Sequence, residues 1–353
     1  HRITSRRLYL GVCIILPLFC LFFMATIFGN GQMENIPIGI VDQDDTATSR
    51  NISRRISATP TFSVTEHFTD EASARQALQR KEIYGYLSIP PRFEQKAVSG
   101  TDASLTYYYH YALLSVGSEL MAAFETTLAP VALSPIIVQA EALGVGQEQM
   151  QTFLLPVEAS THPLYNPDMD YSIYLSQPFF FVLFQILILL VTVYAIGSEF
   201  KFGTTRDWLR AAIPAGKDPD NPQNADILTA VAGKLLPYTL IFSIIGILAN
   251  YVLFGPLHIP FHGSLWLMNV VTILVIMATQ ALAVLIFSFF PKIAYIISVV
   301  SMVGSLGATL SGVTFPVTAM YAPVHAASYL FPVRHFTEAA QAMIYFDAGF
   351  AYF

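Results

Sequence analysis

Five stretches of the chain contain no Asp, Glu, Lys or Arg over a length that can cross a lipid bilayer. They are the runs 8–28, 173–197, 235–254, 265–290 and 293 to about 312. A transmembrane helix needs about 20 apolar residues to cross the hydrocarbon core. The sequence therefore predicts an α-helical polytopic membrane protein with five spans.

The composition of the whole chain agrees with this prediction. Charged residues make up 12% of the sequence, and the mean hydropathy is +0.54. A soluble domain carries about 25% charged residues, so a wholly soluble protein is excluded. The net charge of −6 provides no general basic surface, so we expect no nucleic-acid partner.

Basic residues flank the apolar runs unequally, and this orients them. Nine lie before the first run, between 201 and 234, and at Lys292; only Arg334 follows Gly312. Cytoplasmic loops carry such an excess, so the N-terminus is predicted to be cytoplasmic. A signal peptide also has a basic start (here Arg2, Arg6 and Arg7), but its apolar region covers only about 7–15 residues. We therefore interpret the run 8–28 as a retained anchor.

Residues 32–172 form one large polar insert, which this topology places outside the membrane. They hold 8 Lys and Arg against 17 Asp and Glu, a net charge of −9. Apolar, β-branched runs predict strands at 36–41, 61–65, 83–89 and 104–109, and the intervening patterns predict helices at 45–57 and 71–81. A longer helix is predicted over 112–143, with interruptions near Pro130 and Pro135. The insert is thus an extracytoplasmic α/β domain between residues 1–31, the N-terminal end with the first span, and residues 173–353, the transmembrane domain.

The last charge-free region, 293–333, is too long for one ordinary helix. Gly312, Pro316 and Pro332 are among the residues that break it. We expect a span that ends near Gly312 and then an outer re-entrant segment over 313–340, with Gly312, Phe315, Pro316 and Pro332 as gate or re-entrant residues.

Motifs for catalysis are missing from the sequence. It contains no G-x-x-x-x-G-K-[ST], H-E-x-x-H or G-x-S-x-G, so we expect no catalytic residue and no phosphate-cradling loop. An intramembrane enzyme would need ionisable groups inside the spans, and the predicted span interiors have none.

Three sets of side chains raise the question of a metal or a titrating site. His258 and His262 are four residues apart, but the glycines and prolines around them favour an interfacial loop over a metal-binding helix. Asp42, Asp44 and Asp45 supply oxygens but lack the calcium-loop spacing, which favours a turn and helix cap. The scattered His325 and His335 favour structural roles. We therefore predict no metal site.

Tyrosines gather at the end of the fourth predicted strand. Tyr107, Tyr109 and Tyr111 provide aromatic faces that a ligand or an adaptor could contact. The alternative is that they pack within a strand edge.

The segment after the second apolar run combines a charged and an apolar face. A short amphipathic helix over 199–213 would place Trp208 and Leu209 beside the membrane, and Arg206 toward water or a partner. Glu199 is expected near the N-terminus of this helix, where the helix dipole favours an anion. Thr204 is expected to cap it, and Gly203 to allow a close backbone approach at the bend.

The pattern E-x-x-x-G-T formed by Glu199, Gly203 and Thr204 resembles a signature of type-two ABC exporter permeases. Further segments resemble the same family in chain order. They are Ile-Gly-Ile-Val-Asp42-Gln-Asp44 with Ser49-Arg50, the run from Tyr84 to Phe93 with Pro90-Pro91, Tyr165-Asn166-Pro167, Gly233-Lys234-Leu-Leu-Pro237-Tyr238, Ser311-Gly312-Val-Thr-Phe315-Pro316, and Leu330-Phe-Pro332.

This resemblance implies a function and a set of partners. The chain would be the permease subunit of an exporter in the bacterial inner membrane, moving a small amphipathic molecule, drug or lipid. It would bind no cofactor itself, because ATP and magnesium belong to a cytoplasmic ABC ATPase subunit. A second permease chain, membrane lipid, a periplasmic adaptor and an outer-membrane channel are further implied partners. The resemblance assigns ATPase coupling to Glu199, Gly203, Thr204, Arg206, Trp208 and Leu209.

The family has six spans, so a sixth is expected after Phe353. The alternative function is a membrane-anchored receptor or scaffold, whose outer domain binds a ligand without transport.

Overall fold

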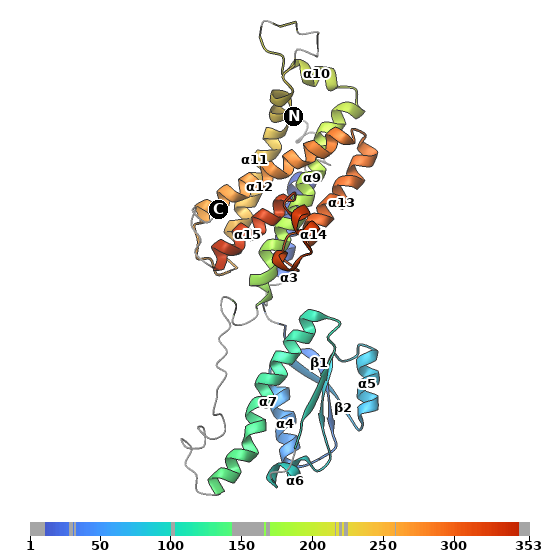
Figure 1. Cartoon of the computed structure of the whole chain (residues 1–353), viewed down its shortest axis with the longest axis vertical. Coiled ribbons are helices and arrows are strands. Elements are labelled where there is room, and N and C mark those ends of the chain that lie inside the picture. The colour runs from blue at the N-terminus through green and yellow to red at the C-terminus, as the bar shows by residue number, and fades with distance from the viewer. Residues whose placement is uncertain are drawn as a thin grey trace. The chain divides into compact units, whose positions relative to one another are not determined.

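The computed structural model describes residues 11–27, 31, 33–99, 103–142, 166, 170–215, 217–218, 221, 225–257 and 259–345, with the backbone alone over 131–142. Arg2, Arg6, Arg7, Tyr165, Pro167 and His258 lie outside the described residues. The chain divides into two compact units. One comprises residues 1–31 and 163–353, here the helical unit, and the other residues 32–162, here the α/β unit (Figure 1).

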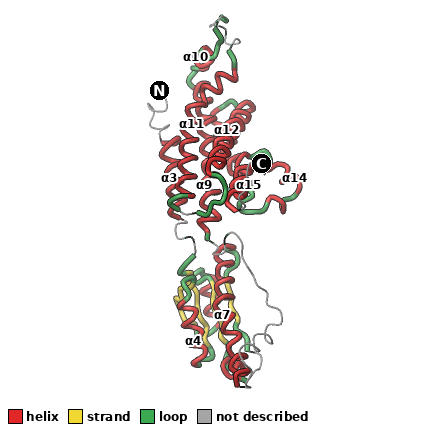
Figure 2. The backbone as a smooth tube through the Cα atoms, turned by 90° about the vertical axis from the view of Figure 1, so that its left-hand side faces the viewer, coloured by secondary structure: helices red, strands yellow, loops and turns green. Residues whose placement is uncertain are grey.

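The described part of the helical unit consists of helices and loops, without strands (Figure 2). Its first helix is a π-turn, η1 (Gly11–Ile15), that continues into α3 (Leu16–Ile27). The other elements are η2 (Ser172–Ser176), α9 (Gln177–Lys201), α10 (Thr205–Arg210), α11 (Ile227–Phe254), α12 (Leu265–Phe289), α13 (Ile293–Thr309), η4 (Val317–Ala319), α14 (Ala322–Ser328) and α15 (Pro332–Tyr345).

Three helical stretches among the described residues are long and apolar enough to cross a membrane: Ser172–Lys201, Ile227–Phe254 and Leu265–Phe289. Two shorter apolar helices, Gly11–Ile27 and Ile293–Thr309, coincide with the first and fifth predicted spans. The helical membrane character is confirmed, whereas the number of spans stays a prediction. The helix that contains the third predicted span begins before the apolar run: α11 begins at Ile227, where Asp226 caps it by accepting the Leu228 N–H at 3.1 Å.

Helix α9 forms the centre of the helical unit. Its apolar side chains lie on all sides of the helix. In the most apolar 18 residues of Ser172–Lys201, 72% of the residues are buried, against 28% for the corresponding stretch of α11 and 33% for that of α12. A helix that is apolar on all sides is typically a buried one. α9 contacts α3, α11, α12, α13 and α15, and Phe180, Phe184 and Phe242 lie at the core of these contacts. The apolar residues that remain exposed on α11 and α12 face outward from this unit.

The α/β unit has a four-stranded sheet in the order β2-β1-β3-β4. β1 (Ile36–Asp42) runs parallel to β2 (Phe62–Phe68) and to β3 (Gly85–Ile89), and β4 (Thr106–Tyr109) is antiparallel to β3. These strands lie where the sequence predicts them. The central strands are buried on both faces, which explains their continuous apolar runs.

Helices cover both faces of this sheet (Figure 1). α4 (Ala47–Ala58) and α7 (Leu114–Ala142) enclose one core with residues such as Ile38, Ile40 and Phe124. α5 (Glu71–Gln79) encloses the second core, with Val41 and Tyr86. A short helix that the sequence did not predict, α6 (Phe93–Val98), buries Phe93 after the Pro90-Pro91 pair.

The predicted interruption of the last helix near Pro130 and Pro135 was wrong. α7 is continuous over both prolines. A proline inside a helix removes the backbone hydrogen bond at its own nitrogen, yet the helical backbone extends from Leu114 to Ala142.

Candidate functional site

A sharp turn follows α9 and separates it from α10. The Thr204 N–H donates to the Glu199 carbonyl at 3.0 Å, and the Gly203 N–H donates to the Phe200 carbonyl at 3.4 Å. This pair of bonds is a Schellman motif, which ends a helix on a residue in the left-handed region. Gly203 occupies that position with φ +68°. The predicted close backbone approach at Gly203 was wrong, because no neighbouring atom lies within 4 Å of the place that a Cβ would take. The glycine is needed for its backbone conformation instead.

Glu199 lies in the last turn of α9, so its predicted place near the N-terminus of the short helix was wrong. Its side chain is 3% exposed. One carboxylate oxygen pairs with the Lys234 ammonium, and the other accepts a hydrogen bond from the Thr204 hydroxyl. The carbonyl end of a helix disfavours an anion. A cation from α11 and a hydroxyl from the turn therefore provide the compensation that the helix itself does not.

The short helix α10 is shorter than the predicted 199–213, because the Schellman turn occupies the residues before Thr205. Thr204 is its N-cap residue, but its side chain bonds Glu199 and makes no cap hydrogen bond within α10. The Trp208 indole N–H donates to the Ala230 carbonyl of α11 at 3.1 Å. Leu209 is half-buried and Arg206 is exposed.

The turn and α10 are thus fastened to α11 at two points, Glu199 with Lys234 and Trp208 with Ala230. We call these contacts and the residues that make them, with Gly203 and Thr204, the α9–α10 clamp. Two of its members, Lys234 and Ala230, were not predicted to have a role. The sequence did contain a signal for Lys234, because this residue directly precedes the charge-free run 235–254.

The predicted gate residues do not form one group. Gly312, with φ +87°, and Pro316 line a cavity of about 630 Å³ beside Tyr174 and Arg334. Phe315 and Pro332 are not among its lining residues: Phe315 is 50% exposed, and Pro332 is buried where α15 begins. α15 packs against α12, α9 and α13 rather than forming an open loop.

The tyrosines of β4 point to two faces of the sheet. Tyr107 stacks on Tyr109 and on Phe124, with ring centroids 5.9 and 5.1 Å apart. Tyr108 stacks on Tyr86 on the opposite face at 4.8 Å. Tyr111 is 52% exposed and meets Tyr109 edge-on. A contact with a ligand or adaptor at these residues stays a prediction, and Tyr111 offers the most accessible ring for it.

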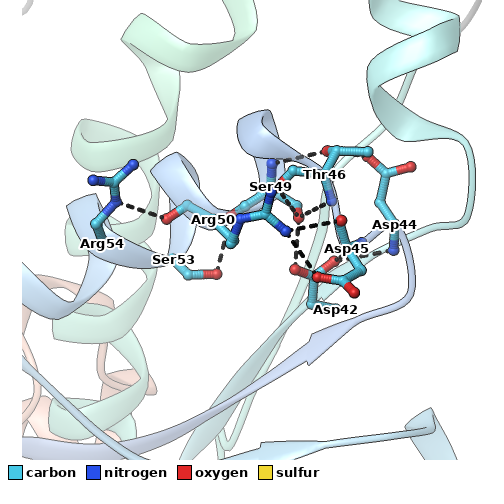
Figure 3. A network of polar contacts seen from close by, with 8 residues as sticks. All are labelled: Asp42, Asp44, Asp45, Thr46, Ser49, Arg50, Ser53 and Arg54. Carbon is cyan, nitrogen blue, oxygen red and sulfur yellow. Dashed lines mark hydrogen bonds and ion pairs between the residues drawn. The ribbon is translucent and has the colours of Figure 1, made fainter.

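The aspartates after β1 serve as a turn and cap (Figure 3). The Asp42 carboxylate accepts the Asp44 and Asp45 N–H groups at 3.0 and 3.1 Å and the Ser49 hydroxyl at 2.6 Å. Thr46 and Ser49 form a reciprocal capping box at the start of α4. These bonds use the oxygens that a calcium ion would need. Among the described residues, no three His, Cys, Asp or Glu side chains are grouped as metal ligands.

The described histidines that were considered for a metal or titrating site lie beside backbone carbonyls or Arg334. His262 Nδ1 lies 2.7 Å from the Ile344 carbonyl. His335 Nε2 lies 3.1 Å from the Tyr329 carbonyl, and the His325 ring lies beside Arg334.

Residues 7–353 match a protein-family model that is described as ABC-2 family transporter protein. The match covers the helices, the clamp and the α/β unit alike. No curated protein and no solved structure matches the chain.

Proposed function

The chain belongs to the ABC-2 family of transporter proteins, and from this we propose that it is the permease subunit of an exporter driven by a separate ATPase. Membership makes it a multi-pass membrane component that is not itself the catalytic subunit and that works with an ABC ATPase. The outward direction, and a small amphipathic molecule, drug or lipid as cargo, belong to the proposal. So do a second permease chain and a location in the bacterial inner membrane with the N-terminus in the cytoplasm.

The α9–α10 clamp is the observation that carries this proposal. An ATPase outside the membrane can act on the spans only through an element that transmits a displacement. Glu199, Lys234 and Thr204 hold the turn after α9 against α11, and Trp208 anchors α10 to α11. A push on α10 therefore reaches two long apolar helices at once.

The outward face of α10 suits a docking partner. Arg206, Asp207 and Arg210 are exposed on this six-residue helix. Charged groups at the rim of an interface mainly set orientation and association rate. The proposed role of Arg206 is thus to orient the ATPase, while the role of Glu199 is to transmit its movement.

The other parts of the proposal follow from the two units. The α/β unit would lie outside the membrane and receive a periplasmic adaptor, with an outer-membrane channel beyond, and Tyr111 offers an exposed aromatic ring for that contact. The loop after α13 with Gly312, Phe315 and Pro316, and the start of α15 at Pro332, would form the outer gate. ATP and magnesium would bind to the partner subunit.

The test separates docking from coupling. The full chain is purified in lipid nanodiscs with the ABC ATPase that copurifies with it, and ATP hydrolysis is measured per complex. Glu199→Gln keeps the size of the side chain but removes the charge that Lys234 needs. We expect the ATPase to remain bound while its regulation by the permease is lost.

Arg206→Glu with Arg210→Glu provides the complementary variant, and we expect it to weaken retention of the ATPase. Arg50→Glu, on the exposed surface of α4, is the matched control. If no ATPase copurifies, or if Glu199→Gln behaves like the control, the proposed coupling is wrong, and the anchored receptor becomes the better description.

A further inference from the structure

The helical unit contains a cavity at the opposite end of α9 from the clamp. Tyr174 lies in the turn before α9, and Glu199 lies in its last turn. At 1.5 Å per residue, the two ends are roughly 37 Å apart. The cavity of about 630 Å³ lies among Tyr174, the loop after α13, and helices α14 and α15. Small-molecule sites occupy about 300–1,000 Å³, so this volume suits a ligand of that size.

One wall of the cavity contains a buried cation, Arg334, of which 5% is exposed. Its Nη1 donates to the Ser328 hydroxyl at 2.6 Å and more distantly to the His325 carbonyl at 3.5 Å. Its Nη2 lies 3.4 Å from the His325 ring nitrogen. The guanidinium carbon lies 3.6 Å from the centroid of the Tyr329 ring.

These contacts hold the guanidinium in place, but none of them comes from a negatively charged group of the described residues. Arginine has five N–H donors in a planar fork that matches carboxylate and phosphate groups. The Arg334 Nε is buried and has no hydrogen-bond partner. No carboxylate forms an ion pair with Arg334 among the described residues, although Glu338, which is exposed, also lines the cavity. Buried charges are ordinarily paired, so the missing partner is an anion.

The rest of the lining shows which kind of anion fits. Tyr174 and Tyr329 provide aromatic surface, and Val313, Pro316 and Val317 provide aliphatic surface. The Tyr174 hydroxyl donates to the Val313 carbonyl at 2.6 Å and fastens the loop to the start of α9. The cavity thus joins one positive group to apolar walls. The carboxylate of Glu338 disfavours a multiply charged anion, so a single negative charge fits best.

We propose that this cavity binds the singly charged carboxylate or phosphate head group of an amphipathic molecule, with Arg334 as the anion-binding residue. The proposal does not depend on ATPase coupling, since the cavity and the clamp share no residue. A membrane lipid and a dissolved anion are two sources of the same chemistry, and the experiment distinguishes them.

The full chain is released from a non-ionic detergent and examined by native mass spectrometry during titration. The probes are phosphatidylglycerol, phosphatidylcholine and inorganic phosphate. We expect the wild type to retain one phosphatidylglycerol at concentrations where it retains no phosphatidylcholine and no inorganic phosphate. Arg334→Gln should raise the apparent Kd for phosphatidylglycerol at least about tenfold.

Two further variants keep the result interpretable. Thr318 lies on the exposed helix η4 and makes none of the guanidinium contacts. Thr318→Trp should fill part of the cavity and also weaken binding, so the test remains valid if Arg334→Gln does not fold. Lys292→Gln removes a cation at the N-cap position of α13, at the end of that helix away from the cavity, and should leave binding unchanged. Equal retention of the two lipids, or unchanged binding in both cavity variants, would overturn the proposal. Tight binding of inorganic phosphate would overturn its amphipathic part.

Discussion

The two units of this protein treat their polar groups in opposite ways. In the α/β unit the polar groups gather at strand ends and helix caps, where Asp42, Thr46 and Ser49 bond one another (Figure 3). In the helical unit, several polar side chains lie inside the helix packing, although those of α10 are exposed. Eight buried side-chain atoms lack a hydrogen-bond partner within the described residues; one, His110 Nδ1, belongs to the α/β unit and the other seven to the helical unit.

The difference reflects how the surroundings of each unit can satisfy its polar groups. A unit surrounded by water, which is the location predicted for the α/β unit, can place polar groups at its surface, where water completes their hydrogen bonds. A helix bundle surrounded by lipid has no water at its surface, so each polar residue must bond another residue of the protein or a bound molecule. Glu199 and Lys234 form a buried ion pair, whereas Arg334 has no counter-ion among the residues that the structure describes. Buried polar groups in such a unit are therefore candidates for function.

The clamp provides the strongest test of this comparison. Glu199→Ala leaves the Lys234 ammonium, which is 17% exposed, without its counter-ion. Breaking one side of a buried pair costs about 3–5 kcal/mol. We expect the largest loss of protection in α9 and α11 when hydrogen exchange is measured by mass spectrometry. The double variant Glu199→Leu with Lys234→Leu removes both charges and should recover most of that loss; if it does not, the pair is not the cause.

The polar cluster after β1 should be the most sensitive polar site of the α/β unit, but less so than the clamp. Asp42→Ala removes the acceptor of the buried Ser49 hydroxyl and of two backbone N–H groups. Leaving such donors unpaired costs about 1–3 kcal/mol. We expect faster hydrogen exchange in α4 and no change in α9. Asp42→Asn keeps an acceptor oxygen and should have a smaller effect, and the comparison fails if exchange in the helical unit changes equally.

Substitutions at two glycines of the helical unit distinguish the effect of backbone conformation on stability from the effect of packing. Neither Gly203 nor Gly233 has an atom near the place of a Cβ. Gly203→Ala forces alanine into the left-handed region and should destabilise the turn by about 1–2 kcal/mol. Gly233→Ala, within α11, should stabilise that helix by up to about 1 kcal/mol. Thermal unfolding of the purified chain checks the opposite signs; equal effects would mean that the turn does not need its glycine.

The exposed ion pair of the α/β unit is the counterpart of the clamp pair. Arg50 and Asp45 are 2.9 Å apart, with side chains 59% and 92% exposed. Such pairs contribute about 0–1 kcal/mol. Asp45→Ala should therefore leave the unfolding midpoint nearly unchanged, in contrast to Glu199→Ala. A loss as large as that of the clamp variant would show that exposure does not separate the two pairs.

The smallest expected effect is a pH dependence that both units share. Asp70 caps α5 and Asp226 caps α11. The Ser73 backbone N–H lowers the pKa of Asp70, and the Thr229 hydroxyl lowers that of Asp226, both below the ordinary 3.8. A lowered pKa means that each cap stabilises its helix above pH 3.8 and loses this effect as the pH falls through the folded-state value. Asp70→Asn and Asp226→Asn should flatten the acid side of the stability profile by similar small amounts.

Much of the architecture was predictable from the sequence because it rests on local patterns. The four strands and the first helices of the α/β unit follow from β-branched runs and cap residues. The capping role of Asp42, Asp44 and Asp45 also followed, because their spacing did not fit calcium. α6 was not predicted, because its six residues become helical only where Phe93 finds a core to enter.

The sequence predicted which segments form the candidate sites, but not the contacts between their residues. The E-x-x-x-G-T pattern located the clamp, but placed Glu199 at the wrong helix end and gave Gly203 the wrong reason. A pattern along the chain does not reveal which residue of another helix supplies the opposite charge. Lys234 is 35 residues from Glu199 in the sequence, and only the packing of α9 against α11 brings them together.

The sequence by itself determined that this chain enters a membrane, that one polar insert interrupts its apolar runs, and that its segments follow the order of an ABC-2 permease. These are properties of composition and local order, which free energies of transfer and short-range hydrogen bonds control. Only the tertiary structure decided which buried charges are neutralised. Within the described part of the chain, Glu199 is paired with a cation and Arg334 has no anion as partner, because the partner of a buried charge depends on which helices pack together.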